Sequence, residues 1–154
     1  HRIFKIKIGA RAPAEDVALA TTVARELGDQ ARLTVDVNQA WDGNTARRNL
    51  PELADAGVTL VEQPVARWNV EALAELAKLP LRSLVMADET VCTPQDALVL
   101  ARITPLPPSS PLLLALRRYH LGRRPVALVL PNGSHEEEWR RWTNCRSTAR
   151  ASSS

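Results

Sequence analysis

The chain has 154 residues, of which 45% are hydrophobic and 24% are charged, and its formal net charge is +3. This size and composition are typical of one folded domain and exclude a disordered or collagen-like chain. There is no apolar run long enough to cross a bilayer, no visible secretory signal and too few cysteines for a disulfide framework, so we expect a cytoplasmic protein without membrane association.

Charge and proline content divide the sequence near residue 103. Residues 1–104 carry 12 basic and 14 acidic side chains, whereas the last 50 residues carry eight arginines and only three glutamates. Six of the eleven prolines also lie in those last 50 residues. We therefore expect two regions, a folded part over 1–103 and an irregular, basic, Pro/Arg/Ser-rich tail over 104–154.

Strands and helices are expected to alternate through the first region. The expected strands are 3–8, 33–37, 59–61 and 84–87, and the expected helices are roughly 14–27, 45–56, 70–78 and one that begins at Pro94. Asn69 and Thr93 are the expected N-caps of the last two helices. Alternation of this kind predicts a parallel sheet. Four such units make half of a (β/α)8 barrel, although an open doubly wound sheet has the same local pattern.

Polar side chains follow the expected strands at regular intervals. Asp36, Glu62 and Asp88 follow the second, third and fourth strands and are 26 residues apart. In a barrel, the carboxyl ends of neighbouring strands meet at one mouth, where three carboxylates repel one another unless a cation holds them. Ligands that are all oxygen favour Mg²⁺ or Mn²⁺ over Zn²⁺. Each acid alone could instead be a helix N-cap, so the argument depends on the joint pattern.

Two lysines lie on the first expected strand. Lys5 and Lys7 are two residues apart, so their side chains share one face of the strand. If this face is the barrel interior, both ammonium groups lie near the metal, where positive charge favours a neutral amine. Such a lysine can move protons beside a metal that stabilises a developing enolate. The simpler alternative is an exposed edge strand.

These residues resemble the enolase superfamily, and within it the subgroup of muconate and chloromuconate cycloisomerases. The resemblance covers about residues 1–103 and depends on four segments, FKIKIG at 4–9, VDVNQAW at 35–41, VEQPV at 61–65 and MADE at 86–89. It implies an α/β fold, a partial (β/α)8 TIM barrel of about four βα units, in an isomerase chain that is incomplete. It also implies a homo-oligomer for the full-length protein.

The resemblance assigns roles to eight residues, which are the metal ligands Asp36, Glu62 and Asp88, the catalytic lysines Lys7 and Lys5, and the substrate-binding or supporting residues Asn38, Glu89 and Trp41. The implied cofactor is Mn²⁺ or Mg²⁺. In the implied reaction, one carboxylate of a cis,cis-muconate-type dicarboxylate adds across a double bond. Lys7 then protonates the metal-stabilised enolate, which gives a lactone. Packing of the loop is an equal alternative for Trp41.

Other functions stay open at this point. An epimerase, a racemase or an acid-sugar dehydratase of the same superfamily would use the same base and metal. An inactive truncated fragment is a further alternative, because nothing precedes His1 where the family has a capping domain, and no lysine follows Lys78 to supply the family's lysine on the sixth strand.

The tail has two alternative explanations. A shift of reading frame near Thr104 in a GC-rich gene would produce a stretch rich in Arg, Pro and Ser. Alternatively, arginines interleaved with Trp139 and Trp142 could contact nucleic acid through phosphates and stacking. We do not expect a nucleic-acid partner, since neighbouring glutamates 136–138 favour a salt-bridged helix.

Overall fold

The computed structural model of the chain describes residues 1–103, 112–116 and 126–129. A strand–helix unit occurs four times in the first range, as β1 (Ile3–Lys7), α1 (Pro13–Leu27), β2 (Arg32–Asp36), α2 (Gly43–Asp55), β3 (Val58–Glu62), α3 (Val70–Ala77), β4 (Leu84–Ala87) and α4 (Pro94–Ile103). A short 3-10 helix, η1 (Gly28–Gln30), joins α1 to β2, and two strands follow, β5 (Leu112–Leu116) and β6 (Val126–Val129).

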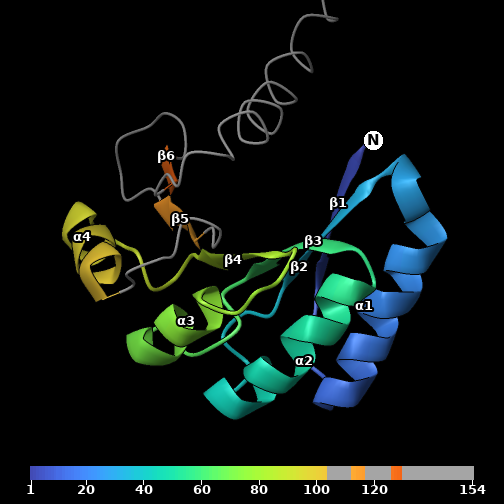
Figure 1. Cartoon of the computed structure of the whole chain (residues 1–154), viewed down its shortest axis with the longest axis horizontal. Helices are drawn as coiled ribbons and strands as arrows, with labels where there is room; N and C mark the ends of the chain where they lie inside the picture. Colours follow the sequence, from blue (N-terminus) through green and yellow to red (C-terminus); the bar gives the residue numbers. More distant parts are fainter. Residues whose placement is uncertain (104–111, 117–125, 130–154) are drawn as a thin grey trace, which may run out of the picture.

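The strands form one sheet whose spatial order, β1 to β6, is also their order in the sequence. β1 to β5 are parallel, and only the pair of β5 and β6 is antiparallel. Helices α1, α2 and α3 lie on the same side of the sheet (Figure 1), and consecutive helices pack against one another. A doubly wound sheet has helices on both faces, so this arrangement favours the partial barrel. The α/β fold expected from the alternating pattern is confirmed.

The tail differs from the sequence prediction in two short segments. β5 and β6 are strands within the region expected to be irregular. Both are runs of apolar residues, LLLAL and VALV, and β5 extends the parallel sheet at the edge that β4 would otherwise leave open. The arginine- and tryptophan-containing stretch proposed as a nucleic-acid patch lies outside the described residues.

Each helix buries an apolar stripe against the sheet. In α2, Ala46, Leu50 and Leu53 are fully buried at helical spacing. Asp42 caps this helix by accepting a hydrogen bond from the Thr45 amide at 2.8 Å. Asn69 caps α3 as expected, by accepting from the amide of the third residue of that helix at 3.2 Å. No helix in the described ranges has both the length and the hydropathy needed to cross a membrane.

Candidate functional site

Consecutive strands place the three predicted carboxylates at one end of the sheet. Lys7 of β1 pairs with Asp36 of β2, and Asp36 pairs with Glu62 of β3, so the strand ends lie side by side. Glu62 in turn pairs with Met86 of β4, two residues before Asp88. All three acids are buried, with exposed fractions of 1%, 6% and 5% for Asp36, Glu62 and Asp88. Buried carboxylates that lie this close need compensating positive charge.

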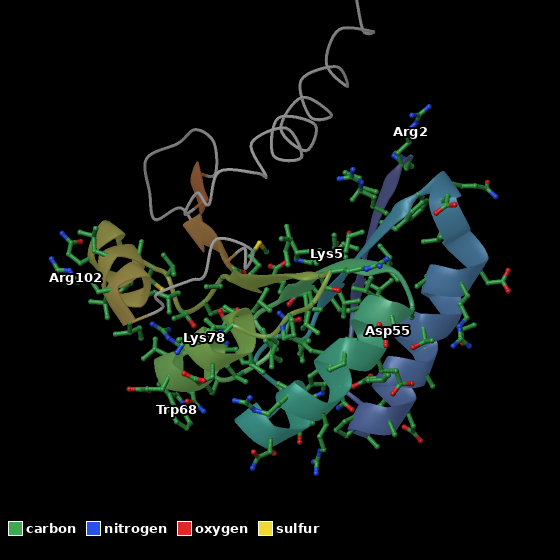
Figure 2. All side chains as sticks on the ribbon, viewed as in Figure 1. Arg2, Lys5, Asp55, Trp68, Lys78 and Arg102 are labelled. Carbon is green, nitrogen blue, oxygen red and sulfur yellow. The ribbon has the colours of Figure 1, made fainter. Side chains whose placement is uncertain are left out.

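The Lys5 ammonium supplies positive charge to two of the three acids. Its Nζ lies 2.9 Å from Asp36 Oδ2 and donates a hydrogen bond to Glu62 Oε2 at 2.5 Å. Lys5 projects from the strand side of the molecule, whereas Asp55 at the end of α2 lies on the helix side (Figure 2). The lysine-bearing face of β1 is therefore the face of the sheet opposite the helices, which in a barrel is the interior face.

The Lys5 contacts also determine the direction of two pKa shifts. Burial alone would lower the pKa of Lys5, but its hydrogen bonds and charge interactions with Glu62 and Asp36 outweigh burial and raise it. Burial raises the pKa of the Glu62 carboxyl, the Lys5 hydrogen bond opposes that rise, and the negative charges of Asp36 and Asp88 add to it. The charge of Asp88 therefore reaches Glu62. The raised Lys5 pKa is opposite to the neutral amine expected of the lysine pair, because carboxylates surround this ammonium.

Lys7 reaches one of the same carboxylates, Asp36, while its side chain stays 67% exposed. Its Nζ donates a hydrogen bond to Asn38 Oδ1 at 3.0 Å and lies 3.6 Å from Asp36 Oδ2. The backbone amide of Asn38 donates to the other oxygen of Asp36, Oδ1, at 3.1 Å. Asn38 thus contacts both Lys7 and Asp36, which orients a movable ammonium next to a buried acid. Most of the Lys7 side chain is therefore open to solvent.

Trp41 and Glu89 lie in different surroundings. Trp41 is a member of the hydrophobic core at 4% exposure, so the structure places its ring in loop packing, and its backbone bridges to Val65. Its Nε1 has no hydrogen-bond partner among the described residues. Glu89 is half-buried beside Asp88, and its Oε2 is buried without a hydrogen-bond partner in the same part of the chain. Glu89 is therefore adjacent in sequence to one of the three acids, Asp88, whereas Trp41 is part of the core.

The three acids suit a hard divalent cation by chemistry, although they do not form a ready-made cage. Within the described ranges, no group of three or more His, Cys, Asp or Glu side chains is already arranged to hold a metal ion. The Lys5 ammonium instead lies between Asp36 and Glu62. The charge of Asp88 acts on the same Glu62 carboxyl. Carboxylate oxygens are nevertheless the donors that Mg²⁺ and Mn²⁺ prefer, so the residue types of this site fit such a cation.

The loop after β1 contains a contact that sequence reasoning missed. The Gly9 amide donates to Asp16 Oδ2 at 2.7 Å, and Asp16 is fully buried at the start of α1. Gly9 has a φ of +101° and lies so close to β2 that a Cβ there would be 2.4 Å from the Val37 carbonyl oxygen. This contact fixes the chain just beyond Lys7. A glycine directly after a strand was the available sequence signal.

Gln63 is the other residue that sequence reasoning missed. It follows Glu62, is fully buried and has a φ of +39°. Its side chain bonds to the loop that follows β4. The sequence showed only a polar residue at a strand end, which gave no indication of these contacts.

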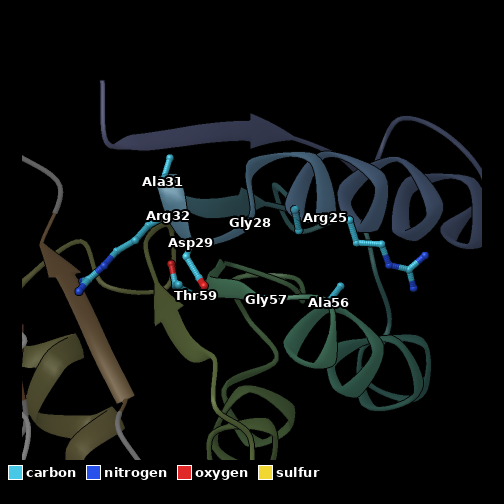
Figure 3. A pocket seen from close by; sticks show the side chains of 9 residues that line it. Arg25, Gly28, Asp29, Ala31, Arg32, Ala56, Gly57 and Thr59 are labelled. Carbon is cyan, nitrogen blue, oxygen red and sulfur yellow. The ribbon is translucent and has the colours of Figure 1, made fainter.

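A cavity of about 360 Å³ lies at the opposite end of the strands. Its lining comes from the end of α1, the segment before β2 and the turn between α2 and β3, and includes Arg25, Asp29, Arg32 and Thr59 (Figure 3). Since these residues precede or begin the strands whose far ends carry the acids, this cavity is separate from the carboxylate site.

Comparison with known proteins places the described strand–helix units in one family. Residues 1–103 match the family model described as enolase C-terminal domain-like. The chain is 46% identical over 102 residues to a chloromuconate cycloisomerase of Pseudomonas putida and equally identical, over the same length, to muconate cycloisomerase 1 of Rhodococcus opacus. Each match covers 66% of this chain and 27% of the relative, so the chain spans about a quarter of the length of these relatives.

Solved structures agree with the sequence comparison. The muconate lactonizing enzyme of Pseudomonas putida aligns with a TM-score of 0.65 and 40% identity over 69% of this chain and 29% of that one. The muconate lactonizing enzyme of Pseudomonas fluorescens in complex with muconolactone aligns with a TM-score of 0.63 and 42% identity, over 67% of this chain and 28% of that one. The similarity is therefore one of both sequence and fold.

Proposed function

The chain belongs to the enolase C-terminal domain-like family, and on that premise we propose that it carries the metal-binding and proton-transfer residues of a cycloisomerase acting on a muconate-type dicarboxylate. The observation that supports this proposal most strongly is the gathering of Asp36, Glu62 and Asp88 at the ends of consecutive strands, with both lysines of β1 against them. Structural acids used as helix caps would contact helix amides, whereas Asp36 and Glu62 contact ammonium groups, and the charge of Asp88 acts on Glu62.

Asp36, Glu62 and Asp88 would hold Mn²⁺ or Mg²⁺ through oxygen ligands. When bound, the cation supplies positive charge that stabilises negative charge developing on a substrate carboxylate. Lys5 contributes a second positive charge on the same side of the sheet, where it can hold the substrate carboxylate once the acids are otherwise compensated. Without a cation at the site, the hydrogen bonds and charges of Glu62 and Asp36 raise the pKa of Lys5, which keeps the ammonium charged beside them.

Lys7 is the proton donor of the proposed reaction. One substrate carboxylate forms a C–O bond to the alkene carbon, the π electrons move toward the carbon next to the other carboxylate, and that carbon takes a proton from the Lys7 ammonium. The product is a lactone, and Lys7 is left neutral until water returns its proton. Asn38 orients the Lys7 amine by accepting its hydrogen bond at 3.0 Å, and the exposed side chain gives access to solvent protons. Proton transfer by a positioned group typically contributes about 10²- to 10⁴-fold to the rate.

The test follows cis,cis-muconate absorbance with the purified full chain in the presence of Mn²⁺. We expect turnover that falls at least about a hundredfold in Lys7→Ala, while Mn²⁺ binding, measured by electron paramagnetic resonance, persists because Lys7 is not a ligand. Lys78→Ala is the matched control, since among the described residues Lys78 pairs only with Glu75, at the surface near the end of α3, and the substitution should leave turnover unchanged. Turnover that survives in Lys7→Ala would refute the assignment of the proton donor.

Metal binding without turnover by the unchanged chain is a distinct outcome. It would mean that the residues of this chain hold the cation but do not complete the reaction. Muconolactone in D₂O then gives a second readout, because Lys7 should still exchange the proton next to the product carboxylate, and nuclear magnetic resonance detects that exchange. Absence of both Mn²⁺ binding and proton exchange would contradict the proposal.

A further inference from the structure

We propose that Gln63 is a positioning residue whose side-chain amide holds Asp88 in place beside Glu62. The inference rests on the proposed function, because it concerns how a proposed metal ligand is presented. Gln63 follows Glu62 directly, and its side chain reaches from the end of β3 to the loop after β4. No chemical step is assigned to Gln63 itself.

The Gln63 amide uses its full hydrogen-bonding capacity. Oε1 accepts from the backbone amides of Asp88 at 2.9 Å and Thr90 at 3.1 Å. Nε2 donates to the Val65 carbonyl at 2.9 Å and to Thr90 Oγ1 at 2.8 Å. Two acceptor sites and two donor hydrogens are all that a glutamine amide offers, so every one is satisfied at a fully buried position. Replacing this side chain by an apolar one would leave buried backbone groups without partners.

The bonds lie where the sheet ladder between β3 and β4 ends. The last backbone bond of this pair runs from the Gln63 amide to the Met86 carbonyl at 2.7 Å. Beyond Ala87 the chain bends into a loop, and the Gln63 side chain bonds to the backbone of Asp88 there. The acid two residues past the pairing is thus placed by a side chain and not by the regular ladder. A small shift of this acid would move a proposed ligand oxygen away from those of Glu62.

Backbone strain at Gln63 supports a functional reason for this arrangement. Its φ of +39° is uncommon for a residue with a side chain. Such positions persist only where surrounding contacts enforce them, and they cluster at functional sites. Gln39, after β2, shows the same combination, since its φ is +69° and its Oε1 accepts from the Arg67 amide in the next loop at 2.9 Å. Its own amide donates to the Gln63 carbonyl at 2.8 Å, which links the two loops.

The test compares Gln63→Met with Ser83→Ala in the full chain, using Mn²⁺ alone as the probe. Methionine has similar length but can make none of the four bonds. Ser83 is a matched control because it is also buried between β3 and β4 and donates to the Val58 carbonyl at 2.6 Å, at the opposite end of these strands. We expect the Mn²⁺ dissociation constant, measured by electron paramagnetic resonance, to rise about 10- to 100-fold in Gln63→Met and to stay within about twofold in Ser83→Ala.

Hydrogen exchange provides a readout that does not depend on metal. The Asp88 and Thr90 amides should exchange at least about tenfold faster in Gln63→Met, with no such change in Ser83→Ala. If Gln63→Met does not fold, Thr90→Val removes one acceptor of Nε2 and keeps both backbone bonds, and we expect about threefold weaker Mn²⁺ binding. Unchanged Mn²⁺ affinity in Thr90→Val would then overturn the proposal.

The outcomes separate this inference from the proposed function. If the unchanged chain binds Mn²⁺ and Gln63→Met binds it equally well, the positioning role is wrong and the metal site stands. Equal losses of affinity in Gln63→Met and Ser83→Ala would also overturn the positioning role, because they indicate general destabilisation. If the unchanged chain does not bind Mn²⁺, the proposed function fails, and the role of Gln63 toward a metal ligand fails with it.

Discussion

At the scale of single residues, left-handed backbone is concentrated in the loops that follow the acid-bearing strands. Asn38, Gln39 and Gln63 are the described residues other than glycine with positive φ. All three come within three residues of Asp36 or Glu62. Each such position costs about 1–3 kcal/mol, so the fold has to enforce them through other contacts. The hydrogen bonds of Asn38 to Asp36 and of Gln63 to the β4 loop supply that enforcement.

Gly9 provides a direct test of how tightly the loop after β1 is fitted. We expect Gly9→Ala to lower the free energy of unfolding by about 3 kcal/mol, from strain at positive φ together with overpacking. Its Cβ would meet the Val37 carbonyl oxygen at 2.4 Å and the Ala40 Cβ at 2.6 Å. Urea unfolding followed by circular dichroism measures the loss.

Gly57→Ala is the control for that measurement. Gly57 has nearly the same φ, +98°, but no atom lies within 4 Å of its added Cβ. The free energy of unfolding of Gly57→Ala should therefore fall by only about 1 kcal/mol, from backbone strain alone. Equal losses for the two variants would show that the close approach of Gly9 to β2 does not exist.

At the scale of elements, the cap of α2 makes part of the stability depend on pH. The hydrogen bonds from the Thr45 amide and hydroxyl lower the pKa of Asp42 below its ordinary value of 3.8. A carboxyl with a lowered pKa in the folded chain contributes stability above its unfolded pKa, and that contribution is lost as the pH falls through the folded value. The cap should therefore weaken only in strong acid.

Asp42→Asn isolates this contribution. Asparagine can still accept from Thr45 but carries no charge, so the Asp42→Asn protein should be less stable than the unchanged chain at about pH 6, and the difference should shrink as the pH falls below the ordinary aspartate pKa of 3.8. The urea unfolding midpoints of both proteins, measured from about pH 6 into acid, give this difference in stability. A difference that persists at the lowest pH would show that the charge of Asp42 is not what stabilises the start of α2.

The elements also show which sequence signals are sufficient. The strand–helix alternation predicted β1 to β4 and their helices to within a few residues, because apolar periodicity and caps such as Asn69 are local. The tail strands were missed because β5 forms by pairing with β4, whose residues lie more than twenty positions earlier. Apolar runs of four or five residues have no local feature that distinguishes a strand from a turn of helix.

At the scale of the whole molecule, equal spacing was enough to bring the acids together. Repeats of 26 residues put Asp36, Glu62 and Asp88 at equivalent points of adjacent units, and parallel pairing places equivalent points side by side. The contacts that refine the site could not be predicted in this way. Gln63 bonds to backbone groups of another strand–helix unit, and the Lys5 ammonium contacts buried carboxylates. Neither contact is reflected in a periodic pattern of the sequence.

The position of Lys5 between two acids couples the stability of the whole chain to divalent cations. Lys5→Met would leave the buried Glu62 without its ammonium partner, and Asp36 with only the more distant ammonium of Lys7 among the described residues. Removing one partner of a fully buried pair costs about 3–5 kcal/mol, and because the Lys5 side chain is 43% exposed, we expect a smaller loss of about 1–2 kcal/mol. A cation bound by the same acids should offset that loss.

Mn²⁺ should therefore stabilise Lys5→Met more than the unchanged chain, in which the ammonium competes for the same oxygens. A ligand at about a hundred times its dissociation constant stabilises the folded state by about 2.7 kcal/mol, enough to exceed the deficit of the variant. Urea unfolding with and without Mn²⁺ measures the stabilisation of each protein, and Lys78→Met, which within the described ranges breaks only the surface pair with Glu75, is the control. Equal stabilisation of all three proteins would mean that Mn²⁺ binds elsewhere, since only the Asp36 and Glu62 carboxylates distinguish Lys5 from Lys78.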